Sequence, residues 1–149
     1  MKLPLNMLML LVAVLFAFAL PAQAQQYQTG TLSVTNTIGT NATVSSLNLP
    51  ITATKNRLVT IAPTFSLNAA GTETVIFSFA RSIDGSNYET TPSVTVTNAA
   101  NGTNVVRSIS TVDMGAAGYL RLQSIQNNNT NASTTITNAT VGYSKKVGN

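Results

Sequence analysis

The stretch ETVIFSFARSIDGSNYE, residues 73–89, decides the fold. In its first half Val75, Phe77 and Phe79 occupy every second position. A period of two predicts a β-strand with one buried face. The pair Asp84-Gly85 then predicts a tight turn, because glycine adopts the positive φ that hairpin turns require. A strand that runs directly into a turn favours antiparallel pairing with its neighbours.

The same alternation, with turn signals between the segments, recurs along the rest of the chain, and no segment after the first two dozen residues has helical periodicity. We expect about eight strands, at residues 31–37, 43–51, 57–67, 73–83, 93–97, 105–112, 119–126 and 134–144. Pro50 predicts an edge or a bend in the second of them. The pattern predicts an all-β domain, an antiparallel β-sandwich, with a jelly roll as one arrangement that it permits.

The predicted core follows from the phase of the large apolar residues within these strands. It consists of Val59, Ile61, Phe65, Val75, Phe77, Phe79, Ile109, Leu120, Leu122 and Val141. The Asn-rich tract at residues 127–131 is expected to be a solvated polar loop, with cross-β association as the alternative.

The first 24 residues have the pattern of a secretory signal peptide. Lys2 provides the positive charge, an apolar run follows it, and Ala22-Gln23-Ala24 supplies the small residues at which such leaders are cleaved. We predict cleavage after Ala24 and a single β-sandwich domain at residues 25–149. The product is then secreted, extracellular or periplasmic, and no later stretch is apolar enough to span a bilayer.

Composition excludes several classes of chemistry. Among 149 residues there is no His, Cys or Trp, and charged residues make up only 8%. These absences exclude zinc sites built on His or Cys, Ser-His-Asp and Cys-His nucleophiles, disulfide scaffolds and haem attachment. The basic residues are scattered, whereas a nucleic-acid surface needs clustered ones. We expect no catalytic residues, no metal site, no cofactor and no nucleic-acid partner.

The segment at residues 79–89 carries the most distinctive motif. Ser82, Asp84, Gly85 and Tyr88 form an S-x-D-G-x-x-Y pattern that resembles a hairpin of secreted and phage β-sandwich modules, some of them galactose-binding. The resemblance implies a jelly-roll domain with a structural or binding role. It covers less than a tenth of the chain, and the motif mainly encodes a turn.

Two binding hypotheses attach to this segment. Asp84, Asn87 and Glu89 offer the oxygen ligands that Ca²⁺ prefers, although two carboxylates make an incomplete set and a plain turn is the simpler interpretation. Tyr88 and Tyr119 are the aromatic residues best placed to stack on a sugar, and partly buried sandwich tyrosines are the simpler interpretation there.

The leading functional hypothesis is a secreted, non-enzymatic structural or adhesive protein of the cell surface or extracellular matrix. Its copies, or other extracellular components, would associate through strand edges or polar Thr/Asn faces. The alternatives are a small glycan- or calcium-binding module and a virion decoration or fibre-type domain. The cleavable leader argues against a phage particle assembled in the cytoplasm.

Overall fold

The computed structural model describes residues 26–45, 47–53, 58–131 and 134–147. The predicted leader and its cleavage site lie outside these residues. The described part contains ten strands and no helix, so nothing in it could cross a membrane as a helix. The strands are β1 (Gln26–Val34), β2 (Ala42–Val44), β3 (Leu49–Thr52), β4 (Leu58–Leu67), β5 (Thr74–Ser82), β6 (Val94–Ala99), β7 (Val106–Arg107), β8 (Ser110–Asp113), β9 (Tyr119–Asn127) and β10 (Ile136–Val147).

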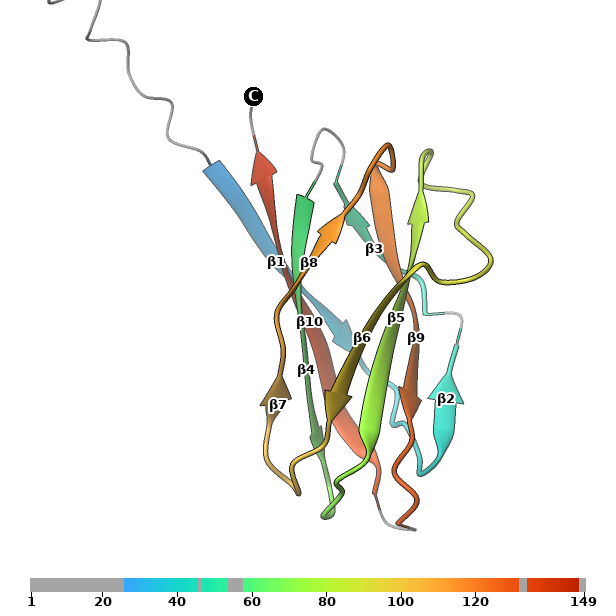
Figure 1. The fold of residues 1–149 in the computed structure, drawn as a ribbon, viewed down its shortest axis with the longest axis vertical. Helices are drawn as coiled ribbons and strands as arrows, with labels where there is room; N and C mark the ends of the chain where they lie inside the picture. The colour runs from blue at the N-terminus through green and yellow to red at the C-terminus, as the bar shows by residue number, and fades with distance from the viewer. Residues whose placement is uncertain (1–25, 46, 54–57, 132–133, 148–149) are drawn as a thin grey trace, which may run out of the picture.

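The strands form two antiparallel sheets packed face to face (Figure 1). One sheet has the order β1-β10-β4-β7, with β8 continuing the β7 side, and the other has the order β2-β9-β5-β6, with β3 continuing the β2 side. Counting β2/β3 and β7/β8 as one strand each gives the eight strands that the sequence predicts. The first pairs with the last, the second with the seventh, the third with the sixth and the fourth with the fifth. Such a rolled-up hairpin is the jelly-roll arrangement.

The core lies between the two sheets and confirms the predicted phase of the strands. Phe65, Phe77 and Phe79 are among its largest fully buried side chains, and the Phe65 and Phe77 rings lie 6.1 Å apart. All the other predicted core residues except Ile109 are also buried. Because these residues come from both sheets, their burial holds the sandwich closed.

The prediction that Ile109 belongs to the core is wrong, because Ile109 lies three positions from both Val106 and Val112 and therefore faces the opposite side of the sheet. Pro63 lies inside β4, where its C=O accepts a hydrogen bond from the N–H of Ser108. The nitrogen of Pro63 faces the same side and carries no hydrogen to donate. The neighbouring strand is therefore interrupted at residues 108–109, between β7 and β8. The register on β4 is the same on both sides of the interruption, so Val106 and Val112 face the core while the side chain of Ile109 points outward and is 69% exposed.

The segment predicted at residues 43–51 is likewise two short strands, β2 and β3. Both pair with β9, but with an interruption where β9 itself is irregular. The register between β5 and β9 skips Gln123, so that Ser78 pairs with Ser124 and Phe79 with Leu122. A bulge of this kind bends the strand that contains it. The β2/β3 edge is therefore broken into pieces of three and four residues.

The expectation of a solvated loop at residues 127–131 is wrong for Asn127 and Asn129, whereas Thr130 and Asn131 are exposed as expected. Asn127 ends β9 and Asn129 follows shortly after it, and both are fully buried. Figure 1 shows that β9 ends at the end of the sandwich opposite the start of β1 and the end of β10. The Asn127 amide donates to the carbonyls of Gly39 (3.1 Å) and Thr134 (2.9 Å). Its side-chain oxygen accepts hydrogen bonds from the backbone N–H (3.1 Å) and the amide (2.8 Å) of Asn129. Asn127 and Asn129 form a buried polar clasp between loops, and they can be buried because their polar groups are paired.

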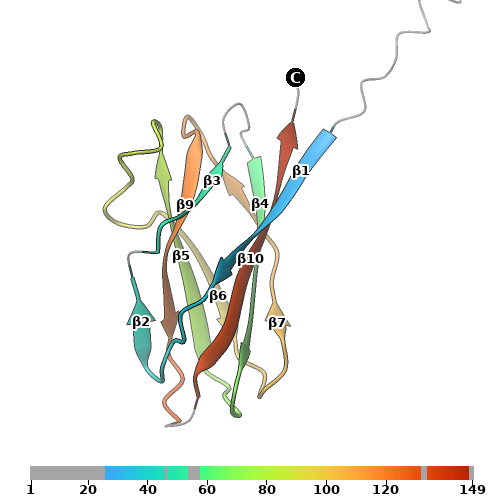
Figure 2. The ribbon, with the colours of Figure 1, turned by 180° about the vertical axis from the view of Figure 1, so that it is seen from behind.

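The two ends of the described chain lie side by side. Gln26 at the start of β1 pairs with Val147 at the end of β10, and the register between these strands is continuous. Figure 2 shows β1 crossing the outside of the sandwich as the outermost strand of its sheet.

Candidate functional site

The motif-bearing segment forms the β5–β6 connection, and Asp84 organises its first turn. The Asp84 carboxylate accepts hydrogen bonds from the N–H groups of Ser86 and Asn87 (both 2.8 Å), the Asn87 amide (2.7 Å) and the Ser82 hydroxyl (2.9 Å). These bonds, foremost those from the backbone of Asn87 and Ser86, hold the pKa of Asp84 far below its ordinary value. Gly85 has a φ of +78°, as the sequence predicts, but the connection from β5 to β6 covers residues 83–93 and is a long loop, not a tight hairpin turn.

Glu89 holds the later part of the same loop against β5. Its carboxylate pairs with the Arg81 guanidinium at 3.2 Å, and it accepts hydrogen bonds from the Arg81 N–H (2.9 Å) and the Ser93 hydroxyl. The N–H of Glu89 donates to the Arg81 carbonyl at 3.0 Å. Burial tends to raise the pKa of Glu89, but the hydrogen bonds from Ser93 and Arg81 outweigh it, so the pKa is lowered.

The two candidate tyrosines both support the loop. The Arg121 guanidinium lies 4.0 Å from the centroid of the Tyr88 ring, in cation–π geometry. Burial raises the pKa of Tyr88, although the positive charge of Arg121 acts in the opposite direction. Tyr119 packs beneath Gly85, so closely that a Cβ there would lie 3.0 Å from its ring. Arg121 therefore covers one face of the Tyr88 ring, and the turn covers Tyr119.

The loop forms one wall of a cavity of about 440 Å³. Ile83, Asn87, Tyr88 and Glu89 come from the β5–β6 connection, and Arg81 and Ser82 from the end of β5. The other wall is the β8–β9 connection, residues 114–117. Asn87, Tyr88 and Glu89 thus line one hollow, while Asp84 and Tyr119 are not among its lining residues.

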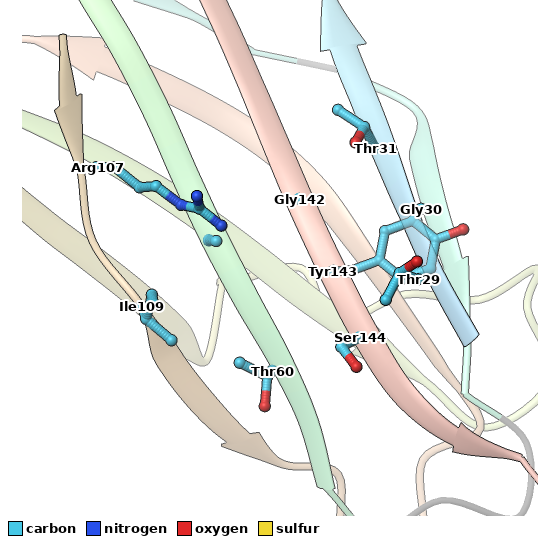
Figure 3. A pocket seen from close by; sticks show the side chains of 10 residues that line it. Thr29, Gly30, Thr31, Thr60, Arg107, Ile109, Gly142, Tyr143 and Ser144 are labelled. Carbon is cyan, nitrogen blue, oxygen red and sulfur yellow. The ribbon is translucent and has the colours of Figure 1, made fainter. Parts of the chain in front are cut away.

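A second hollow, of about 280 Å³, lies on the outer face of the β1-containing sheet. Figure 3 shows Thr29 and Thr31 of β1 on one side of it and Arg107 and Ile109 on the other. Its floor is Gly142 of β10 beside Ala62 of β4, two residues with little or no side chain. The hollow exists because the floor residues are small and because strand alternation places Arg107 and Ile109 together on the outer face, at its edge.

Sequence reasoning missed Arg81, Arg121 and the wall at residues 114–117. In the sequence Arg81 continues the every-second-residue spacing of the core residues of β5, so the pattern does not indicate that it forms an ion pair. The 114–117 wall is brought to the loop by the hydrogen bond from the N–H of Gly118 to the carbonyl of Ser82 (3.0 Å). A pairing between residues so far apart in the chain leaves no local signal. The stacking of Arg121 on Tyr88 is likewise set by strand pairing, because the two residues are far apart in the sequence.

The oxygen ligands considered for Ca²⁺ already have donors around them. Asp84 and Glu89 each accept hydrogen bonds from N–H and O–H groups of the loop and of β5, and a cation would have to displace these donors. Among the described residues no three His, Cys, Asp or Glu side chains gather closely enough to hold a metal ion. The geometry of the loop is that of an internally bonded turn.

Comparison with known proteins gives likenesses of structure alone. No family model and no curated sequence matches the chain. A chain from Bacillus endospore appendages, described as disulfide-linked pili, is 12% identical, with a TM-score of 0.40 over 83% of this chain and 91% of that one. Murine APRIL is 13% identical (TM-score 0.43, 80% and 99% covered), and the PRD1 vertex protein P5 is 10% identical (TM-score 0.42, 82% and 96% covered). These similarities concern the β-sandwich fold alone. The function of the chain is therefore inferred from its own residues.

Proposed function

We propose that the protein is an exported, non-enzymatic building block whose copies associate through the free edge of β1. The observation that carries the proposal is the character of that edge. β1 is nine residues long and pairs in continuous register with β10 on one side, and no other strand of the described residues pairs with its opposite side. It contains no charged residue, no proline and no bulge. A long, flat, uncharged edge strand is a template for pairing with another chain.

The other edges of the sandwich are shorter, and most carry features that discourage such pairing. On the β2/β3 edge the pieces are three and four residues long, with the exposed Pro50 in β3. On the β7/β8 edge they are two and four residues long and carry Arg107 and Asp113. β6 is uncharged but only six residues long. Because four of the five edge pieces other than β1 are very short, β1 is the edge best suited to association.

The occupant that fits this edge is β1 of a second copy. Antiparallel pairing centred on Gly30 would place Thr29 opposite Thr31 of the partner copy, so that hydroxyl-bearing side chains face one another across the junction. Such an interface is its own complement and obeys twofold symmetry. It would merge two five-stranded sheets into one continuous sheet.

The non-enzymatic part of the proposal is supported by the hydrogen bonds that the acidic side chains accept. The sequence has only four carboxylates, and each accepts a backbone N–H. Glu73 accepts that of Thr130, Asp84 those of Ser86 and Asn87, Glu89 that of Arg81, and Asp113 that of Gly115. Acids held as acceptors in this way are structural, and a chain without His has few other general bases.

Export is supported by the position of β1 relative to the predicted leader. Cleavage after Ala24 would leave β1, which begins at Gln26, at the start of the mature chain. Mass spectrometry of the protein recovered from a secreting host tests this, with an intact Met1 end as the contradicting result.

Light scattering coupled to size-exclusion chromatography tests the association. The variant Thr29→Lys/Thr31→Lys places two charges on the exposed side of β1 and is expected to convert an associated species into a monomer. The matched control, Thr95→Lys/Thr97→Lys, alters the same Thr-x-Thr pattern on the exposed side of β6 and should behave as the unmodified protein does. A monomeric unmodified protein at high concentration, or dissociation by both variants alike, would refute the role of β1.

A further inference from the structure

We infer that the cavity between the β5–β6 and β8–β9 connections is a binding site for a neutral saccharide ring. The inference rests on this cavity alone and is independent of β1. Its volume of about 440 Å³ falls within the range of small-molecule sites, about 300–1,000 Å³.

The walls of the cavity are set before any ligand arrives. Asp84 gathers the turn through its four accepted hydrogen bonds, and Glu89 ties the loop to Arg81. On the opposite wall the N–H of Ala117 donates to the carbonyl of Met114 at 2.8 Å. A site already held in one conformation loses less entropy on binding, which favours even a small ligand.

The lining residues select the chemistry of that ligand. Arg81 and Glu89 pair with each other at 3.2 Å, so the lining carries no net charge. A charged ligand would have to compete with this pair. A wholly apolar ligand would take the pair and the Asn87 amide away from water without replacing those hydrogen bonds, which is unfavourable. The fitting ligand therefore has no charge and many hydroxyl groups.

The same cavity also offers an apolar surface. Ile83 is 78% exposed although it follows directly after a core strand, and the 114–117 wall contributes Ala116 and Ala117 beside the buried Met114. Ile83 and the two alanines thus give the cavity an apolar side next to its polar lining, the combination common in small-molecule sites. A sugar ring combines one C–H face, suited to Ile83 and the alanines, with hydroxyls suited to Asn87, Tyr88 and the ion pair.

The test is a titration of the isotopically labelled protein, followed by the shifts of its backbone amide signals. The probes are glucose, galactose, mannose and N-acetylglucosamine, with glucuronic acid as the charged comparator. At least one neutral sugar is expected to shift the signals of residues 81–89 and 114–117 in a saturable way at about 10 mM, which is roughly tenfold above a Kd of 1 mM. Glucuronic acid is expected to bind more weakly.

Two variants and one control assign the effect to the cavity. Asn87→Ala and Ile83→Ser should each weaken binding, by about tenfold for the lost hydrogen bonds of Asn87. The exposed Ile83 takes no part in the hydrogen bonds of the loop described above, so its variant tests the site even if Asn87→Ala disturbs the turn. Tyr27→Ala, which removes a 62%-exposed aromatic residue on β1, should leave binding unchanged.

Three results would overturn the inference. They are no shift with any neutral sugar, shifts confined to residues outside the cavity, and binding that Ile83→Ser does not change. The variant Thr29→Lys/Thr31→Lys should bind the sugar as well as the unmodified protein, so a failure of self-association and a failure of sugar binding are seen separately.

Discussion

Replacing Asn127 by alanine should be among the most destabilising single changes of a polar residue in this domain. Its side chain is fully buried and takes part in four hydrogen bonds, two donated to Gly39 and Thr134 and two accepted from Asn129. With about 1 kcal/mol for each, the substitution should lower the free energy of unfolding by about 4 kcal/mol. Since a domain has only about 5–15 kcal/mol in total, this loss would be large.

Two neighbours in the same tract provide a graded comparison. Asn129→Ala removes two side-chain hydrogen bonds, to Asn127 (2.8 Å) and from the N–H of Glu73 (3.0 Å), so we expect a loss of about 2 kcal/mol. Asn128→Ala removes one, to the Thr74 hydroxyl (2.8 Å), in a half-buried position, and should lose about 1 kcal/mol or less.

Urea denaturation of the three variants measures these differences. The double variant Asn127→Ala/Asn129→Ala should lose about 1 kcal/mol less than the sum of its parts, because the two residues share a side-chain hydrogen bond. If Asn127→Ala costs no more than Asn128→Ala, the buried clasp does not contribute as its geometry indicates and the reasoning fails.

Three further predictions concern the turn, the edge strand and a buried amide. Asp84 has a pKa below that of the unfolded chain, so its contribution is present above about pH 4 and fades below it. Asp84→Asn should therefore lower the melting temperature at pH 7, and its deficit should narrow at pH 3; an equal deficit at both would contradict this. A Cβ at Gly30 would overlap the Tyr143 ring, so Gly30→Ala should destabilise by about 1 kcal/mol as the ring leaves its rotamer, and by much less in a Tyr143→Ala background. The buried Asn98 amide nitrogen has no hydrogen-bond partner among the described residues, so Asn98→Leu should raise stability in urea by about 1 kcal/mol, and a clear loss would show that the amide is satisfied.

Much of the fold could be predicted because burial on one face imposes a period of two. Val75, Phe77 and Phe79 show this period without interruption and occupy the core. The prediction for Ile109 failed because Val106, Ile109 and Val112 are spaced by three residues, so a period of two cannot place all of them on one face. Val106 and Val112 face the core, and Ile109 faces outward. The prediction that Asn127 and Asn129 are exposed failed because a polar side chain is expected to be exposed unless its hydrogen-bond partners are known. Those partners lie on other loops.

Only the part of the candidate site that lies within the β5–β6 connection could be predicted from the sequence. Asp84-Gly85 specifies its turn through local hydrogen bonds, so the segment could be singled out from the sequence. Whether Asn87 and Glu89 face a hollow depends on the β8–β9 connection, which strand pairing brings against them. The roles of Arg81 and Arg121 depend on register in the same way. Local chemistry was therefore accessible, and the assembly of a cavity from distant segments was not.

The adjacency of Gln26 and Val147 has a mechanical consequence. Tension applied to the two chain ends would load the ladder between β1 and β10 one rung at a time and unzip it from its open end. Tension passed along β1 to a neighbouring molecule would instead load all the rungs together in shear, which resists far more. A fibre or coat made of this domain would therefore be strong where subunits join edge to edge and weak wherever a tether is attached to its termini.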